Sequence, residues 1–177
     1  EQYHIIAQTN NLLKWLDVNG ELVLSDSLQK MIRGEALAIR AFLHFDLLRG
    51  WGPANYAGNE SVREMKCIPY RTVADHSKQP QLPASEVLAN IISDLKEARE
   101  CLDYEKELDL SDRIEGRHMR FNYHAINALL ARVYNYAGEK DSAALHALKV
   151  IEECGLALES GNDNDPILSK EVIVGLN

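Results

Sequence analysis

The spacing of apolar residues along the chain predicts five helices. Apolar side chains recur every three or four residues, the period of a helix with a buried face, over residues 3–17, 25–49, 83–102, 121–137 and 140–154. Glycine or proline stands beside these segments, and the pair Asn19-Gly20 is expected to stop the first helix. We therefore expect an all-α protein.

The helix over residues 25–49 is apolar on two sides. Its two stripes together comprise Ala38, Ile39, Ala41, Phe42, Leu43, Phe45, Leu47 and Leu48. A helix of this kind needs neighbours on both sides, so we expect it inside a bundle. The helix over residues 83–102 has a single stripe with charged residues opposite, and we expect it to pack on one side.

Residues 121–137 and 140–154 form two helices joined by a very short turn at Gly138. So short a connection makes them antiparallel neighbours. In the second of them we expect the stripe of Ala144, Ala147, Leu148 and Ile151 to be the packing face, because small residues let helices approach closely. Hairpins that stack in this way indicate an all-α fold of tetratricopeptide-like stacked helical hairpins with one long irregular loop.

Two segments lack a helical period. Residues 50–83 contain four of the five prolines and form the long irregular loop. A loop of this length inside a compact domain indicates a functional excursion. Residues 156–177 form a tail, in which Glu171–Val174 fits either a short strand or the start of a helix. We expect residues 1–177 to be a single helical domain.

The composition excludes several classes of protein. Lys and Arg number 19 against 27 Asp and Glu, and the formal net charge is −8. No basic cluster offsets this charge, so no nucleic-acid partner is expected. No stretch is apolar over the roughly 18 residues of a membrane span. Cys67, Cys101 and Cys154 form no CxxC pair, so we expect neither a disulfide framework nor a zinc site.

No pattern of catalytic residues stands out. The six histidines form no HExxH motif, and the chain has no GxSxG elbow and no Walker loop. Glu35, Arg40, Arg33 and Asp46 share one helix, where we expect structural ion pairs. The run Asn162–Pro166 offers oxygen ligands but lacks the glycine of an EF-hand loop. We therefore expect a protein that is not an enzyme, with no cofactor and no bound metal.

The loop that follows the second helix contains the side chains best suited to bind a ligand. Trp51, Asn55, Tyr56 and Tyr70 lie in or beside it. Flat aromatic faces stack on sugar rings, and amides hydrogen-bond to sugar hydroxyls. We expect these four residues to contact a ligand, whereas the alternative for Trp51 is that its ring only covers the helix end.

Several segments resemble one family in the same order along the chain. The most specific is Arg33–Pro53, RGEALAIRAFLHFDLLRGWGP, which resembles the "GEA…RA…F.L…G..P" helix of SusD/RagB-type outer-membrane nutrient-binding lipoproteins. Glu86–Ala98 resembles the family's "EV…I..DL..A" helix, and Gly116-Arg117 resembles its "GR" approach to the next helix. Ala128–Tyr134, with Gly138 and Ala143, resembles "ALLARVYLY.G…A", and Glu171–Ile173 resembles "E.IF".

The resemblance implies a non-catalytic cell-surface protein that binds a glycan or another nutrient. Its implied partner is a SusC-like TonB-dependent outer-membrane transporter, to which it would deliver the ligand. The resemblance covers about the first half of such a protein, so residues 156–177 would lead toward a missing C-terminal half. It also implies a lipid anchor in the outer membrane, on a cysteine that this chain does not contain. The alternative is a generic tetratricopeptide-like adaptor that binds a peptide or protein.

Overall fold

Helices make up most of the fold, as the spacing of apolar residues predicts. The computed structural model describes residues 1–75, 77–107, 110, 116–157 and 171–175, and its helices are α1 (Gln2–Val23), α2 (Asp26–Trp51), α3 (Ala84–Cys101), α4 (Tyr123–Ala137) and α5 (Lys140–Glu153). Ser25 and Asn122 cap α2 and α4 by accepting hydrogen bonds from the N–H groups of Leu28 and Ala125. Gly138 ends α4 in the left-handed conformation, with φ of 85°.

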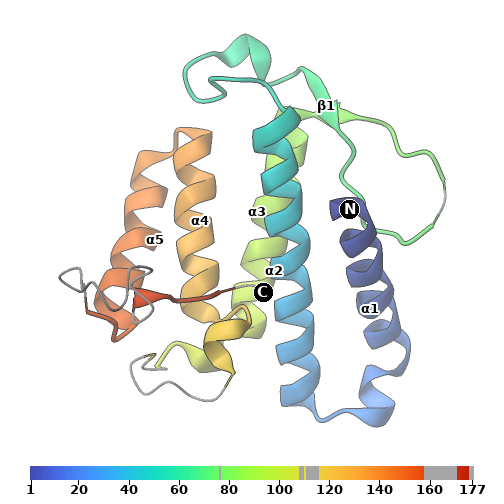
Figure 1. The fold of residues 1–177 in the computed structure, drawn as a ribbon, viewed down its shortest axis with the longest axis vertical. Helices are drawn as coiled ribbons and strands as arrows, with labels where there is room; N and C mark the ends of the chain where they lie inside the picture. Colours follow the sequence, from blue (N-terminus) through green and yellow to red (C-terminus); the bar gives the residue numbers. More distant parts are fainter. Residues whose placement is uncertain (76, 108–109, 111–115, 158–170, 176–177) are drawn as a thin grey trace.

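The five helices stand side by side in the order of the chain (Figure 1). Each packs on the next, from α1 to α5. α2 lies between α1 and α3, as its two apolar stripes predict, and α3 buries the stripe of Val87, Leu88, Ile91, Leu95 and Ala98. One continuous core includes buried side chains of α1, α2, α3 and α4. The predicted all-α fold of stacked helical hairpins is confirmed.

The end of α1 differs from the prediction. The pair Asn19-Gly20 was expected to stop this helix, but α1 continues to Val23. Gly20 is buried, and a Cβ atom built there would lie 2.7 Å from Nε2 of Gln29. The space beside this glycine is filled by the side chain of Gln29 from α2. Helix propensity alone favours a stop at glycine, and tertiary packing overrides it here.

The long loop between α2 and α3 contains short regular elements. A single 3₁₀ turn, η1 (Glu60–Val62), precedes the strand β1 (Lys66–Ile68), which pairs antiparallel with β2 (Leu82–Pro83). The segment between the two strands crosses toward α1 (Figure 1). The carbonyl of Pro69 accepts a hydrogen bond from the hydroxyl of Tyr3, and the carbonyl of Arg71 accepts one from the amide of Asn10. The loop is thus bound to α1 along its return path.

The packing face of α5 also differs from the prediction. The structure buries His146 and Val150, which face α4 and its surroundings. Of the predicted stripe, Ala144, Leu148 and Ile151 are exposed. The prediction that this stripe faces α4 is therefore wrong. α5 has two apolar sides, and periodicity alone does not say which one meets the neighbouring helix.

The described end of the tail lies against the start of α4. The side-chain amide of Asn122 donates a hydrogen bond to the carbonyl of Ile173 at 3.0 Å, and the N–H of Gly175 donates to the carbonyl of His118 at 2.8 Å. Residues 172–175 form neither a helix nor a strand. In residues 172–175, both possibilities that the sequence leaves open are replaced by these two hydrogen-bonded contacts.

Candidate functional site

Trp51 and Asn55 are exposed where α2 gives way to the loop. Trp51 is the last residue of α2, and its side chain is 69% exposed. Gly52 and Pro53 then end the helix, because proline cannot continue the hydrogen-bond ladder. Asn55 is exposed and has a positive φ of 56°, a conformation that asparagine tolerates better than most residues. An indole face and an amide are thus available to solvent at one end of α2.

Tyr56 follows Asn55 in the loop and is only 7% exposed. Its ring stacks on that of Tyr136 from α4, with 5.5 Å between the ring centroids. The guanidinium of Arg63 lies over the Tyr56 ring at 5.5 Å. The hydroxyl of Tyr136 donates a hydrogen bond to the carbonyl of Pro53. Tyr56 therefore holds the loop against α4 instead of presenting a free face.

Tyr70 lies in a separate buried network between α1, α2 and α3. Its hydroxyl donates a hydrogen bond to Asp94 at 2.5 Å, and its ring stacks on His44 with a centroid separation of 3.9 Å. Burial and the neighbouring carboxylate both raise the pKa of Tyr70, so the hydroxyl stays protonated. Arg40 binds both oxygens of Asp94 and also the amide oxygen of Asn10.

Asn55 and Tyr56 thus lie in the loop that follows Trp51 at the end of α2, and Tyr70 is buried against the helices. The aromatic partners Tyr136 and His44 were missed at the sequence level. Tyr136 follows the exposed Asn135 at the end of α4, and no local pattern links it to a loop 80 residues earlier in the chain. Contact between a ligand and Trp51, Asn55, Tyr56 or Tyr70 stays a prediction, for which Trp51 and Asn55 have the free surfaces.

A hollow of about 530 Å³ beside the first half of α1 was also missed. Exposed His4, Gln8 and Asn11 line it from the helix, and Arg71 and Asp75 line it from the loop. Arg71 is fixed there by hydrogen bonds to the carbonyl and the carboxylate of Asp75. Amides, a guanidinium and a carboxylate are groups that hydrogen-bond to hydroxyl-rich ligands. These residues come from two segments that are distant in the chain, so they form no motif in the sequence.

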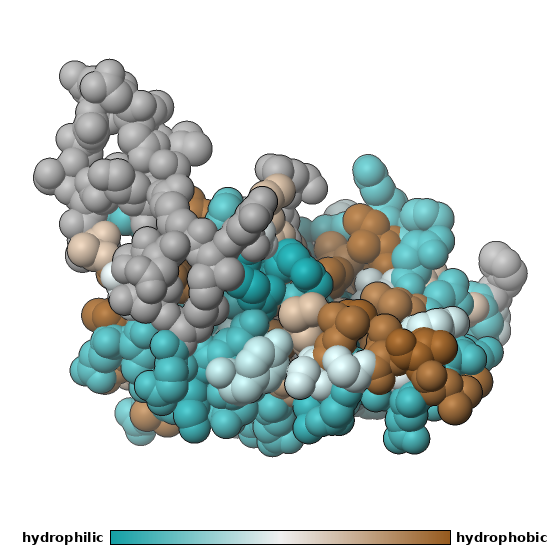
Figure 2. Space-filling view, turned by 90° about the horizontal axis from the view of Figure 1, so that it is seen from below, coloured by the Kyte–Doolittle hydropathy of each residue, from teal (hydrophilic) through white to brown (hydrophobic). Residues whose placement is uncertain are grey.

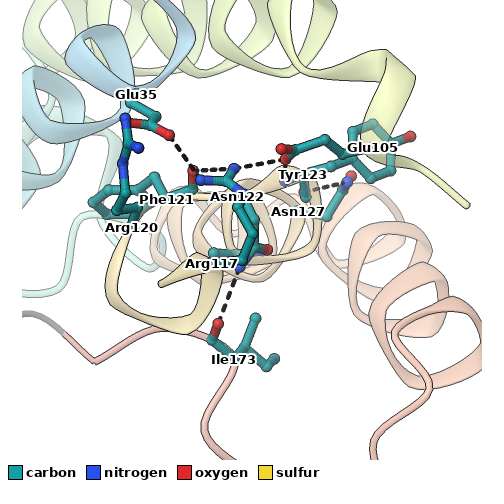
Figure 3. Close-up of polar contacts among 10 residues, drawn as sticks. Glu35, Glu105, Arg117, Arg120, Phe121, Asn122, Tyr123, Asn127 and Ile173 are labelled. Carbon is teal, nitrogen blue, oxygen red and sulfur yellow. Dashed lines mark hydrogen bonds and ion pairs between the residues drawn. The ribbon is translucent and has the colours of Figure 1, made fainter. Parts of the chain in front are cut away.

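The charged residues of α2 pair with neighbours, as expected. Glu35 accepts hydrogen bonds from Arg117 at 2.7 Å and from Arg120 at 2.6 Å (Figure 3). Arg117 also donates to Glu105 and to the carbonyl of Phe121. Arg117 belongs to the Gly116-Arg117 pair of the resemblance, and in this structure it joins α2 to the segment that leads into α4.

The remaining charges of that predicted cluster point to other elements. Arg33 forms ion pairs with Asp17 on α1 and Glu97 on α3. Asp46 accepts a hydrogen bond from Gln2 on α1 and also pairs with Arg49 on α2 itself. Arg40 binds Asp94, as described above. Four charged residues that share a helix in the sequence therefore serve four different contacts, and the structure does not assemble them into one site.

The described ranges contain neither a three-ligand metal site nor a membrane-spanning helix. Within them, no group of three or more His, Cys, Asp or Glu side chains could hold a metal ion. The run Asn162–Pro166 lies outside the described residues. None of the helices in the described part of the chain is both long and apolar enough to cross a membrane.

Comparison with known proteins assigns the chain to a family. The sequence model of a SusD-like family, described as "Starch-binding associating with outer membrane", matches residues 1–135, and the chain belongs to this family. Over 141 residues it is 28% identical to the SusD-like protein P38 of Formosa agariphila; the match covers 78% of this chain and 24% of that protein.

Solved structures agree with this assignment. A SusD superfamily protein from Bacteroides thetaiotaomicron has a TM-score of 0.76 at 25% identity, and the match covers 93% of this chain and 33% of that one. A Bacteroides vulgatus protein described as a sugar binding protein has a TM-score of 0.69 at 29% identity. The match covers 86% of this chain and 32% of that one. The chain thus spans about a quarter to a third of the length of these relatives.

Proposed function

We propose that this chain is the helical part of a non-catalytic cell-surface protein that binds a glycan and delivers it to a SusC-like TonB-dependent outer-membrane transporter. The observation that carries the proposal is the family match over residues 1–135, with its description of starch binding at the outer membrane. The complete protein would be held on the outer membrane by a lipid anchor that lies outside residues 1–177.

The surface at the end of α2 supports the glycan-binding part of the proposal. Trp51 offers an exposed indole face and Asn55 an exposed amide, the pair of groups that sugar binding requires. The stack of Tyr56 on Tyr136 holds the same loop in place before a ligand arrives, which lowers the entropy lost on binding. The remaining contacts would come from the rest of the complete protein.

Calorimetry on the complete protein tests this proposal. We expect soluble starch, or another polysaccharide from a plant and algal panel, to bind. Trp51→Ala should weaken binding about tenfold, equivalent to roughly 1–2 kcal/mol for the loss of one stacked ring. The matched control is Trp15→Ala, which removes an exposed tryptophan from α1 (44% exposed) and should leave affinity unchanged.

Other outcomes would redirect or overturn the proposal. Loss of binding in Asn11→Ala but not in Trp51→Ala would place the ligand in the hollow beside α1. Absence of binding across the whole polysaccharide panel, together with capture of a peptide or protein ligand, would favour the tetratricopeptide-like adaptor. Polysaccharide hydrolysis that a single Asp or Glu substitution abolishes would contradict the non-catalytic role.

A further inference from the structure

The hollow between α1 and the return path of the long loop has polar side chains that the described part of the fold does not use. His4, Gln8 and Asn11 line it, and they follow one another at the four- and three-residue spacing that puts them on one side of α1. All three are exposed, and none forms a side-chain hydrogen bond within the described part of the chain. Two amides and an imidazole are therefore free to bind a ligand from the helix side.

The loop side of the hollow is held rigidly at Arg71. The backbone N–H of Arg71 donates a hydrogen bond to Nε2 of His44 at 3.0 Å, and its carbonyl accepts one from the amide of Asn10 at 3.0 Å. Its guanidinium donates to the carbonyl of Asp75 at 2.6 Å and to the carbonyl of Ser77 at 3.1 Å. Backbone and side chain are both fixed, so this wall exists before a ligand arrives, which lowers the entropy lost on binding.

Arg71 and Asp75 still have hydrogen-bonding capacity for a ligand. A guanidinium has five N–H donors, and the bonds of Arg71 to Asp75 and Ser77 use three of them. Oδ1 of Asp75 accepts from Arg71 and from the N–H and hydroxyl of Ser77, whereas Oδ2 accepts no hydrogen bond from the described residues. Hydrogen bonds from Ser77 and the charge of Arg71 lower the pKa of Asp75, so its carboxylate stays an ionised acceptor at neutral pH.

The size and the charge of the hollow indicate the class of ligand. Its volume of about 530 Å³ lies in the range of about 300–1,000 Å³ that is typical of small-molecule sites. Ala7, Pro69 and Ala74 form apolar parts of its lining. Among the described lining residues, Arg71 and Asp75 are the only members of the Asp, Glu, Lys and Arg set, and they neutralise each other. An uncharged sugar fits, because its C–H faces are apolar and its hydroxyls both donate and accept.

We propose that this hollow is a second glycan-binding subsite, separate from the surface at the end of α2, and that it takes a short uncharged stretch of a glycan of about the size of a disaccharide. This inference rests on the proposed function, because it assigns a further contact of the same ligand. Gln8 and Asn11 bind sugar hydroxyls from the helix, and Arg71 and Asp75 bind them from the loop. The small side chain of Ala7 leaves the space for the sugar ring.

The two subsites lie at the same end of the α1–α2 pair. The amide of Gln2 donates a hydrogen bond to Asp46 at 2.8 Å, which brings the start of α1 to the last turns of α2, where Trp51 ends the helix. The loop that forms the other wall of the hollow returns past this start of α1 (Figure 1). A polysaccharide that contacts both subsites binds more tightly than a disaccharide at either one, because the second contact is intramolecular.

Calorimetry on the complete protein in a Trp51→Ala background tests the second subsite, because this change weakens the first. The titrants are the uncharged disaccharides maltose, cellobiose and laminaribiose, with glucosamine, glucuronic acid and triglycine as probes of other chemistry. We expect at least one disaccharide to bind and the other probes not to bind.

Three further substitutions in the same background locate the binding. Asn11→Ala should weaken disaccharide binding about threefold to tenfold, as expected for the loss of one hydrogen bond. Ala7→Leu fills the hollow and should abolish binding. The matched control is Asn19→Ala, which removes an amide from the same helix outside the hollow, where it is bonded to the carbonyl of Trp15. This control should leave the affinity unchanged.

The outcomes separate this proposal from the proposed function. Disaccharide affinity that both Asn11→Ala and Ala7→Leu leave unchanged would overturn the second subsite alone, as would absence of disaccharide binding in the Trp51→Ala background while the wild type still binds polysaccharide. A wild type that binds no glycan at all would overturn both. Binding of glucosamine, glucuronic acid or triglycine instead of the disaccharides, with loss in Ala7→Leu, would assign the hollow to another class of ligand and overturn the proposal. Far-ultraviolet circular dichroism checks that each variant is folded, and Asn11→Ala decides if Ala7→Leu is not.

Discussion

At the scale of single residues, His44 is held by hydrogen bonds at both of its ring nitrogens. It is fully buried, and its Nδ1 lies 2.9 Å from the carbonyl of Arg40. Its Nε2 accepts a hydrogen bond from the backbone N–H of Arg71 at 3.0 Å. Nδ1 must therefore carry the proton and Nε2 must not. Burial lowers the pKa of His44 to about 4, in agreement with this neutral tautomer.

The lowered pKa predicts that stability falls in mild acid. The unfolded chain binds a proton at His44 below about pH 6.5, whereas the folded protein does so only below about pH 4. Acid therefore favours the unfolded state between these values, and at pH 5 the loss from His44 should reach about 2 kcal/mol, at 1.36 kcal/mol per pH unit. Urea unfolding at pH 7 and pH 5 measures this difference.

Two variants isolate the contribution of His44. His44→Gln has no titrating ring, so its loss of stability between pH 7 and pH 5 should be about 2 kcal/mol smaller than that of the wild type. His4→Gln removes an exposed histidine and should keep the wild-type pH dependence. Burial also lowers the pKa of His146 to about 4, so His44→Gln should retain part of the acid sensitivity. Identical pH dependence in wild type and His44→Gln would contradict this account.

The candidate site shows how far single residues can be interpreted from sequence. A tyrosine in a loop looks available to a ligand, but its exposure depends on partners that are distant in the chain. Tyr56 is covered by Tyr136, and Tyr70 is hydrogen-bonded to Asp94. Trp51 has no such partner among the described residues and keeps its free face. Sequence could therefore name the aromatic residues in and beside this loop but not which of their rings point outward.

At the scale of elements, Gly34 sets the distance between α2 and α3. A Cβ atom built there would lie 2.9 Å from Cγ of Leu102 and 3.0 Å from both the carbonyl oxygen of Ala98 and Cβ of Cys101. The first distance is shorter than real Cβ contacts, and the other two are tighter than most of them and involve a backbone atom and a Cβ atom that cannot rotate away. The glycine of the Arg33–Pro53 motif is therefore needed for close helix packing.

Gly34→Ala should destabilise the protein even though alanine is the better helix former. We expect a net loss of about 1–2 kcal/mol, because overpacking costs about 1–3 kcal/mol and helix propensity returns up to about 1. The matched control is Gly50→Ala on the same helix, where a Cβ atom would meet nothing within 4 Å. This control should be neutral or up to about 1 kcal/mol more stable. Chemical denaturation compares the two, and equal midpoints would show that α2 and α3 do not depend on Gly34.

Element boundaries followed from sequence where the signal is local. The Ser25 cap of α2, the Asn122 cap of α4 and the left-handed Gly138 all act through their nearest neighbours in the chain. The end of α1 did not follow, because Gly20 serves the contact with Gln29 from another helix. The face of α5 that meets α4 was also wrong, because two apolar stripes on one helix are equivalent until the neighbours are known.

At the scale of the whole molecule, the row of helices has an apolar side at each end. On α1 the exposed apolar residues are Ile5, Leu12, Trp15, Val18, Leu22 and Val23, and on α5 they are Leu145, Leu148 and Ile151. Figure 2 shows a hydrophobic area on the side where α1 lies. The net charge of −8 acts against contact between these ends in separate molecules.

These opposing terms predict how residues 1–177 behave on their own. We expect weak, reversible self-association that strengthens between about 0.05 M and about 0.5 M salt, because salt screens the repulsion between acidic chains and leaves the attraction of the apolar faces intact. Sedimentation equilibrium over a range of protein concentrations measures it. Strictly monomeric behaviour at every salt concentration would show that the exposed side chains are too dispersed to act as faces.

Replacing Leu22 and Leu148 with lysine separates the two terms. The double variant Leu22→Lys and Leu148→Lys lowers the magnitude of the net charge, so repulsion alone would predict stronger association. It also breaks the apolar surface on α1 and on α5, where these side chains are 81% and 52% exposed. If the apolar faces drive association, the double variant should be more monomeric than the wild type in spite of its reduced charge. Stronger association of the variant would instead show that charge governs the contacts between chains.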